Sequence, residues 1–370
     1  MNESDVSLPV QTVDQWEART RVLNKKILVL SLGGTIVSYP DPEQGGKLGP
    51  HPEPLKLFRE HTTIHEMADL DFRLVANVDS TNMKSEFWLD TAHAIAEKQD
   101  NYDGILVTHG TDTMSHTAAA LRFLLGENLR TPVILTGAQI RLGGGDRSDA
   151  RTNLGDSIET LIAARNDCVN EVIVVFGHRV LRGNRAIKVS ELEYTAFESP
   201  AYPDLISLNS GRVSFRRSPF VSRVDLSRYP GNYALPPIEI TDGFAATPLE
   251  LSMNPDFEVT DGLKDLFARR VYTAVVMRSF GAGNIPRNII PAIEELSQLG
   301  VPVIIGASHP GAGMNTEYIV GQEPIDAGAV PTGNMLTHSA LIKLRILQKR
   351  GFPLDKIKRE MPVSYQGEVG

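Results

Sequence analysis

Short apolar segments bounded by turn residues recur along the first half of the chain. They are rich in β-branched residues, barely alternate between apolar and polar positions, and span 27–32, 72–78, 104–107, 132–135 and 172–176. Segments that are apolar on both faces are typical of a parallel sheet covered by helices. The pattern therefore predicts that these segments are buried strands of one sheet.

Stretches with helical spacing separate these predicted strands. One follows Ser85, with apolar residues at Trp88, Ala92 and Ile95, and another follows Asp149. A third spans 115–125 and ends at a glycine, which is a common helix terminator. Strands that alternate with helices predict an α/β fold with a doubly wound, mostly parallel sheet.

The second half of the chain predicts a separate, smaller domain. Residues 216–237 are rich in proline and have no sustained periodicity, which is typical of a linker. Beyond them the α/β pattern resumes in a shorter cycle, with strands at 271–277 and 301–305 and helices at 288–299 and 337–350. The predicted organisation is an N-terminal extension, a larger catalytic α/β domain, a linker and a smaller C-terminal α/β domain: 1–25, 26–215, 216–237 and 238–370.

Composition and charge narrow the class of protein. The 370 residues include 37 Lys and Arg against 45 Asp and Glu, and a net charge of -8 disfavours binding to nucleic acid. The single cysteine, Cys168, excludes an internal disulfide and indicates a reducing compartment. The N-terminus lacks the apolar core of a signal peptide, and no apolar run approaches the ~20 residues that span a bilayer. We therefore expect a cytoplasmic protein without membrane contact.

Polar residues gather where the first three predicted strands end. Thr35 follows the pair Gly33 and Gly34, "VDSTNM" covers 78–83, and "THGTDTM" covers 108–114. Ligands of open α/β sheets bind beyond the carboxyl ends of the strands, so these hydroxyl groups and the carboxylate of Asp112 would face a common crevice. Helix capping is the alternative role of each turn, because Ser, Thr and Asp are preferred N-caps.

Other chemistries are not supported by the sequence. "GGTIVSYPDPEQGG" is a polar loop that lacks the third glycine of a dinucleotide fingerprint and is broken by Pro40 and Pro42. The chain has neither a phosphate-binding loop nor a nucleophile elbow. His109 and His116 are too far apart for one helix face to present both to a metal, so structural roles are expected for them. We expect no cofactor and no metal.

Eight motifs, in this order along residues 26–350, resemble the bacterial-type L-asparaginases of the asparaginase/glutaminase superfamily, with a cytoplasmic type I-like layout. They are "LGGTIV", "DSTNM", "THGTDTM", "TGAQIR", "RSDARTNL", "RGNRAIKV", "AFESP" and "SFGAGNIP". The resemblance implies a cofactor-free amidohydrolase that converts L-asparagine and water to L-aspartate and ammonia. It also implies a homodimer or homotetramer.

The resemblance places the nucleophile of an acyl-enzyme at Thr35 and a proton-shuttling group at Thr111, Asp112 and Lys188. A threonine hydroxyl needs a base to remove its proton. Lys188 can be that base only when neutral, yet the neighbouring Asp112 would favour its charged form, so the sequence leaves its state open. The alternative for Lys188 is a solvated cation in the basic "RVLRGNRAIK" stretch.

For the substrate, the resemblance assigns Ser80 and Thr81, together with Asp112, to the α-carboxylate and amino end. Asn284 would reach the same pocket from the second domain. We expect the substrate to be a small amide, L-asparagine or a close relative.

The loop after Thr35 departs from the family pattern. A tyrosine on a mobile lid is expected there, and in "QGGKLGP" Lys47 occupies its position. Tyr39 is the only tyrosine of this loop. The phenol could therefore come from Tyr39, its role could fall to Lys47, or the group could be dispensable.

Three other functions remain open. The glutaminase subunit of a tRNA-dependent amidotransferase shares these motifs, but such subunits usually carry an additional N-terminal β-domain. An amidohydrolase for a modified amide would fit the altered lid. An amino-acid-binding homologue without turnover would fit Lys47.

Overall fold

The computed structural model describes residues 25–208, 213, 215, 240, 243–310, 312–313 and 319–369. The predicted N-terminal extension, apart from Lys25, and the predicted linker at 216–237 lie outside the described residues. The chain divides into two compact units, Met1–Glu198 with Asp204–Ile240 and Ser199–Pro203 with Thr241–Gly370.

A seven-stranded sheet forms the centre of the N-terminal unit, in the order β11-β8-β7-β6-β5-β1-β4. The five predicted strands are present and pair in parallel: β1 (Lys26–Gly33), β4 (Asp69–Val78), β5 (Gly104–Thr108), β6 (Val133–Thr136) and β7 (Val172–Phe176). Two antiparallel strands at one edge, β8 (Arg179–Arg182) and β11 (Ile206–Ser207), were not predicted from the sequence. Gly177 and His178 join β7 to β8 with positive φ at both residues, as a type I′ turn requires.

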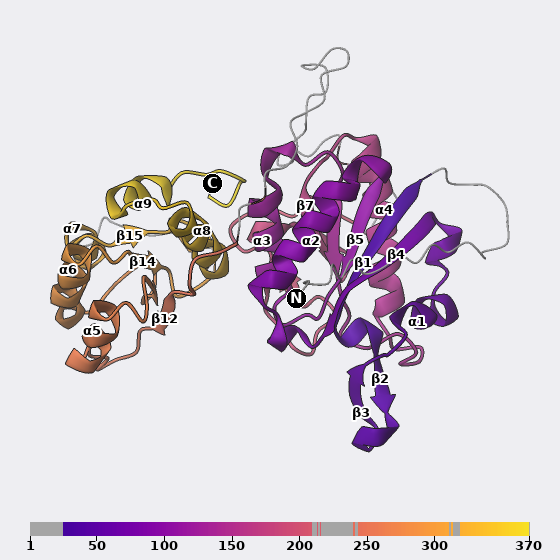
Figure 1. The fold of residues 1–370 in the computed structure, drawn as a ribbon, viewed down its shortest axis with the longest axis horizontal. Helices are drawn as coiled ribbons and strands as arrows, with labels where there is room; N and C mark the ends of the chain where they lie inside the picture. Colours follow the sequence, from indigo (N-terminus) through magenta and orange to yellow (C-terminus); the bar gives the residue numbers. More distant parts are fainter. Residues whose placement is uncertain are drawn as a thin grey trace, which may run out of the picture. The chain divides into compact units, whose positions relative to one another are not determined.

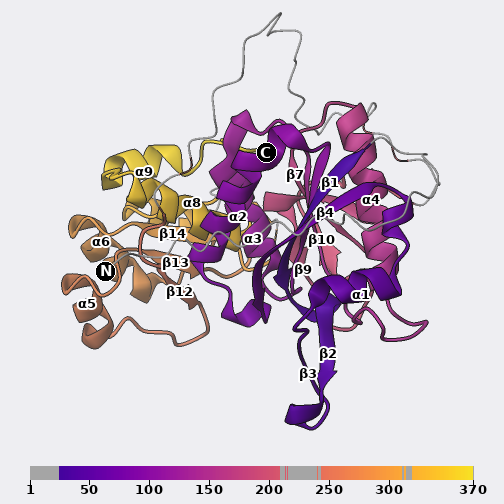
Figure 2. The ribbon, with the colours of Figure 1, turned by 45° about the vertical axis from the view of Figure 1, so that its right-hand side comes forward.

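Helices cover both faces of this sheet. Helices α2 (Ser85–Lys98) and α3 (Met114–Leu125) pack together on one face, and α4 (Ala150–Asn166) lies on the other (Figures 1 and 2). Gly104 of β5 lets α4 approach closely, because a Cβ there would lie 2.9 Å from Leu161 Cδ2. The arrangement is the predicted doubly wound, mostly parallel α/β fold.

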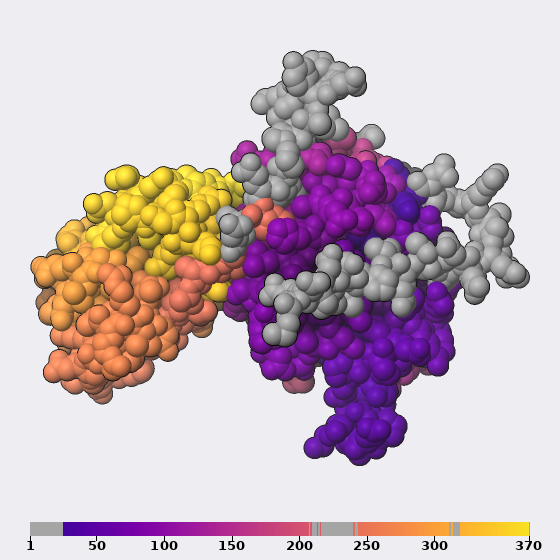
Figure 3. Space-filling model, viewed as in Figure 1, coloured from indigo at the N-terminus to yellow at the C-terminus, as the bar shows by residue number. Residues whose placement is uncertain are grey.

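The segment after Thr35 forms a hairpin, whereas the sequence pattern indicated only a polar loop. Strands β2 (Ser38–Asp41) and β3 (Lys47–Pro50) pair antiparallel, and Gly45 and Gly46 turn the chain with positive φ. The hairpin projects from the N-terminal unit just before helix α1 (Pro54–His61) (Figures 1 and 3). A two-stranded ribbon has only edge strands, so it tolerates Pro40, which cannot donate to the ladder.

The C-terminal unit contains a smaller parallel sheet, as predicted. Its order is β12-β13-β14-β15, with bounds β12 (Leu249–Ser252), β13 (Val275–Arg278), β14 (Val303–Gly306) and β15 (Val330–Pro331). The helices of the unit are α5 (Asp261–Ala268), α6 (Ile290–Gln298), α7 (Ile319–Asp326), α8 (Thr337–Lys349) and α9 (Leu354–Glu360). Apolar residues of β13 and β14 pack with Ile293 and Leu296 of α6. Across the described residues of both units, every helix is too short or too polar to cross a membrane.

A buried ion pair fastens the end of the chain to α8. Lys343 Nζ lies 2.8 Å from Glu368 Oε1 and donates to the carbonyl of Met361 at 3.0 Å. The side chains of Lys343 and Glu368 are 1 % and 0 % exposed. Burial alone would raise the pKa of Glu368, but the Lys343 ammonium and the backbone N–H groups of Tyr365 and Gln366 outweigh it and lower that pKa.

Replacing Lys343 by methionine should lower the free energy of unfolding by about 3–5 kcal/mol, because it leaves a buried carboxylate without its cation. Urea unfolding at pH 7, followed by circular dichroism, measures the change. Lys349→Met, an exposed position on the same helix, is the matched control. The folded-state pKa of Glu368 is depressed. The contribution of the Glu368 carboxylate to the free energy of unfolding is therefore present above the unfolded pKa of about 4.3 and is lost as the pH falls through the folded value. Equal unfolding midpoints for wild type and Lys343→Met would contradict this account.

Candidate active site

Glycines bring the loops at the carboxyl ends of four strands into close contact. A Cβ at Gly34, after β1, would lie 2.2 Å from the backbone nitrogen of Gly110, after β5. A Cβ at Gly110 would lie 2.6 Å from Ser80 Oγ, after β4, and one at Gly137, after β6, would lie 2.5 Å from the carbonyl oxygen of His109. Gly34 also has a φ of +86°, a backbone conformation that residues other than glycine rarely adopt. Larger residues could not replace these glycines without separating the loops.

Thr35 lies at this meeting point. It opens the short 3₁₀ turn η1 (Thr35–Val37) directly after Gly34, and its carbonyl oxygen accepts a hydrogen bond from Ser38 Oγ at 2.9 Å. Its side chain is half-buried. Thr35 and Thr111 each follow one glycine of the contact between Gly34 and Gly110, so both lie at the same edge of the sheet.

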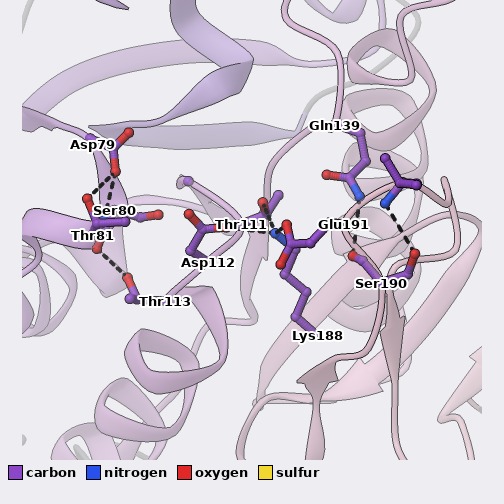
Figure 4. A network of polar contacts seen from close by, with 12 residues as sticks. Asp79, Ser80, Thr81, Thr111, Asp112, Thr113, Gln139, Lys188, Ser190 and Glu191 are labelled. Atoms are coloured by element: carbon purple, nitrogen blue, oxygen red, sulfur yellow. Dashed lines mark hydrogen bonds and ion pairs between the residues drawn. The ribbon is translucent and has the colours of Figure 1, made fainter.

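Lys188 connects the candidate catalytic residues. It lies in β9 (Ile187–Lys188), which pairs antiparallel with β10 (Phe197–Glu198). Its Nζ donates to Thr111 Oγ1 at 2.9 Å, to Asp112 Oδ1 at 2.7 Å, and to Glu191 (Figure 4). The Lys188 side chain is 10 % exposed, which contradicts the alternative of a solvated surface cation.

The surroundings of Lys188 fix its protonation state. Burial alone would lower the pKa of Lys188, but the hydrogen bonds and negative charges of Asp112 and Glu191 raise it above the ordinary value. At neutral pH Lys188 is therefore an ammonium group, and its three N–H donors match the three acceptors around it. In this state it polarises the Thr111 hydroxyl and has no lone pair with which to accept a proton.

The loop after β4 is organised by its own side chains. Asp79 Oδ1 accepts hydrogen bonds from the backbone nitrogen and the hydroxyl of Thr81, at 2.8 and 2.7 Å. These bonds lower the pKa of Asp79. Thr113 Oγ1 donates to the carbonyl oxygen of Ser80 at 2.8 Å and so ties this loop to the loop after β5 (Figure 4). Ser80 is buried beside Gly110, whereas Thr81 is exposed.

Three predicted site residues lie outside this cluster of contacts. Tyr39 and Lys47 are on the projecting hairpin, where the Tyr39 ring lies edge-on to His51 at 4.9 Å and Lys47 is exposed. Asn284 belongs to the C-terminal unit, in a tight turn after β13 where its backbone nitrogen donates to the carbonyl of Phe280 at 2.9 Å. Its approach to the substrate remains a prediction.

A buried histidine supports the loop that carries Thr111. His109 is 0 % exposed, and its ring nitrogens lie 2.7 Å from the Gly110 carbonyl (Nδ1) and 2.7 Å from Thr117 Oγ1 (Nε2). A carbonyl can only accept, so Nδ1 carries the proton; Thr117 donates to Nε2 and accepts from Trp88 Nε1 at 2.9 Å. Burial lowers the pKa of His109 to about 4, so the ring is neutral at pH 7. These contacts are those of a structural histidine.

Two residues were not predicted from the sequence: Glu191, which contacts Lys188, and Gln139, which contacts the loop of Glu191. Glu191 follows β9 in an exposed loop, and Gln139 lies between β6 and α4. The side-chain amide of Gln139 donates to the carbonyl oxygens of Glu193 at 3.1 Å and Ser190 at 3.4 Å. The sequence signal for Gln139 was its place in "TGAQIR", but no periodicity shows that an amide here meets a loop 51 residues away.

Two family models match this chain. Residues 26–221 match "Asparaginase, N-terminal", and residues 258–361 match "Glutaminase/Asparaginase C-terminal domain". The chain belongs to the asparaginase family. It is therefore an enzyme of the amidohydrolase class, and the predicted family and fold class are both confirmed.

Relatives of known name extend this result. The chain is 30 % identical to the L-asparaginase of Thermococcus kodakarensis, over 93 % of this chain and 99 % of that protein. It is 32 % identical to L-asparaginase 1 of Escherichia coli K12, over 83 % and 84 %. A glutamyl-tRNA(Gln) amidotransferase subunit from Pyrococcus abyssi is 28 % identical over 93 % of this chain and 76 % of that protein. Among solved structures, the thermostable L-asparaginase from Thermococcus kodakarensis has a TM-score of 0.76 at 28 % identity and covers 93 % of this chain and 99 % of its own.

The buried His109 should make this asparaginase-family protein sensitive to acid. Its folded-state pKa of about 4 is below the unfolded value of 6.5, so the unfolded chain takes up the proton first as the pH falls. Stability should fall between those two pH values by about 3 kcal/mol from this residue alone.

Urea unfolding from pH 7 to pH 4, followed by tryptophan fluorescence, measures this loss. His109→Gln should be less stable at pH 7 but should show a shallower fall with acid. His93→Gln, an exposed histidine on α2, should keep the wild-type slope. If His109→Gln and wild type lose stability in parallel, His109 does not cause the acid sensitivity.

Proposed function

We propose that this protein hydrolyses the side-chain amide of L-asparagine, or of a close relative, through an acyl-enzyme on Thr35. The observation that carries the proposal is the direct contact of Lys188 with Thr111 and Asp112, beside the glycine contact that presents Thr35. Membership of the asparaginase family supports the reaction class.

The proposed reaction has two steps. The oxygen of Thr35 attacks the amide carbon as its proton leaves, and backbone N–H groups beside Thr35 or Thr111 stabilise the oxyanion, each donor contributing about 10²–10³ in rate. The carbon–nitrogen bond then breaks, and the nitrogen leaves as ammonia after taking up one proton, which balances the proton lost by Thr35. In the second step water attacks the Thr35 ester, and aspartate and the free hydroxyl are released.

Thr111, Asp112 and Lys188 serve proton transfer and orientation in this proposal. Because Lys188 is an ammonium that donates to Thr111 Oγ1, the Thr111 hydroxyl is more acidic and suits a proton donor to the leaving nitrogen. Asp112 is 48 % exposed while bound to Lys188, so it is accessible to the α-ammonium group of a substrate.

The remaining predicted contacts belong to the substrate and the assembly. Ser80 and Thr81 bind the α-carboxylate and amino end, and Asn284 contributes from the C-terminal unit. We propose that the enzyme works without cofactor or metal, as a homodimer or homotetramer in the cytoplasm, with no nucleic acid or membrane partner.

A second candidate is the glutaminase subunit of a tRNA-dependent amidotransferase. The similarity to the Pyrococcus abyssi protein, over most of this chain, favours it. Side-by-side assays with L-asparagine, L-glutamine and modified amides separate these functions. Tight binding of aspartate without hydrolysis of any amide would instead favour a binding protein.

Thr35→Ala should reduce ammonia release from L-asparagine by at least about 10³-fold, because the nucleophile is lost. Thr35→Ser, which keeps a hydroxyl, should retain part of the activity. Thr63→Ala removes an exposed threonine without a capping hydrogen bond and should match wild type. Ammonia release by Thr35→Ala at the wild-type rate would rule out an acyl-enzyme on Thr35.

The hairpin variants Tyr39→Phe and Lys47→Ala test where the proton of Thr35 goes. If one of these groups assists, its variant alone should lower kcat by about 10²-fold or more and change the pH–rate profile. If both variants keep full activity, neither hairpin residue is catalytic and the proton of Thr35 does not leave through the hairpin. Comparing kcat from pH 5 to 10 for the two variants and wild type decides between these outcomes.

A further inference from the structure

Glu191 is a second carboxylate partner of Lys188. It lies in the loop between β9 and β10, three residues after Lys188, and accepts a hydrogen bond from Lys188 Nζ. Its side chain is 75 % exposed. An exposed ion pair on a mobile loop contributes little to stability or to the position of its partner. The effect of Glu191 on Lys188 therefore depends on how firmly the loop of Glu191 is held.

Hydrogen bonds fix this loop on both sides of Glu191. The Gln139 amide donates to the carbonyls of Ser190 and Glu193, which flank Glu191 and Leu192. Ser190 Oγ accepts from the backbone nitrogens of Leu192 and Glu193 at 3.2 and 3.0 Å. Gln139 is itself held, because its backbone nitrogen donates to the buried Asp149 Oδ2 at 3.0 Å. The backbone that carries Glu191 is thus held by a connected network of hydrogen bonds (Figure 4).

The net charge around Lys188 depends on the Glu191 carboxylate. In the described part of the chain, the charged groups that act on Lys188 are Asp112, after β5, and Glu191, after β9. One ammonium and two carboxylates leave the cluster with one excess negative charge. A bound α-ammonium group would cancel it, whereas without Glu191 two cations would compete for Asp112.

We propose that Glu191 is a positioning residue that neutralises part of the positive charge of Lys188. Asp112 then keeps negative charge for the substrate ammonium group while Lys188 donates to Thr111. This role rests on the proposed function, because it assigns the substrate ammonium to Asp112. Gln139 supports the role by holding the loop.

The first test measures Lys188 directly and needs no turnover. In protein labelled with ¹³Cε-lysine, with Lys188→Arg to assign the resonance, the Lys188 pKa should fall by about one unit in Glu191→Gln. Glu193→Gln removes a charge from the same exposed loop without touching Lys188 and should leave the Lys188 pKa at its wild-type value. An identical Lys188 pKa in wild type and Glu191→Gln overturns the proposal, even if the enzyme acts on another amide.

The second test uses steady-state kinetics on the intact enzyme. Glu191→Gln should raise KM for the amino-acid amide several-fold and move the alkaline limb of the kcat profile to lower pH, by the same shift as the Lys188 pKa. Glu191→Asp should recover part of both effects, and Gln139→Leu should change both in the same direction but less. A uniform loss of kcat with unchanged KM and an unshifted pH profile would show a merely structural role and overturn the proposal.

Discussion

The close approach of Gly34 and Gly110 is the constraint on which the candidate site depends. A Cβ added to Gly34 would overlap the backbone of the loop that contains Gly110, so the loops after β1 and β5 meet without side chains between them. Each loop then places a threonine one residue beyond its glycine, Thr35 in one and Thr111 in the other. Ser80, in the loop after β4, packs on Gly110, which brings three strand ends together.

Electrostatic interactions at Lys188 are the second constraint on the candidate site. Lys188 is nearly buried, and an isolated ammonium group there would lose its proton or destabilise the fold. Asp112 and Glu191 outweigh that cost and raise the pKa of Lys188, so the group that donates to the Thr111 oxygen is an ammonium at neutral pH. Two carboxylates thus keep Lys188 charged, one from a strand end and one from a loop that Gln139 holds.

Buried ionisable groups play different parts in the two units. In the N-terminal unit, His109 is kept neutral by burial and uses both ring nitrogens to brace the loop that carries Thr111. In the C-terminal unit, Lys343 and Glu368 are kept charged by one another, and they tie the last residues to α8. In both cases the site or the chain end is ordered by groups whose state depends on their surroundings rather than on their residue type.

The sequence by itself determined the main strands, the helices between them and the polar residues at the strand ends. These features are local, because a strand that is apolar on both faces and a helix with a spaced apolar face need no knowledge of the rest of the chain. The parallel sheet then follows, and with it the common edge at which Thr35, Ser80 and Thr111 lie. The hairpin at Tyr39 and Lys47 was missed because its prolines and glycines are also typical of loops.

Only the tertiary structure decided the chemistry at Lys188. Its charge depends on Asp112, 76 residues away, and on Glu191, whose loop is fixed by an amide from between β6 and α4. Such contacts depend on side-chain direction and burial after folding, and neither periodicity nor spacing carries that information. The sequence therefore predicted the candidate residues of the site, while the folded arrangement set their hydrogen-bond partners and the charge of Lys188.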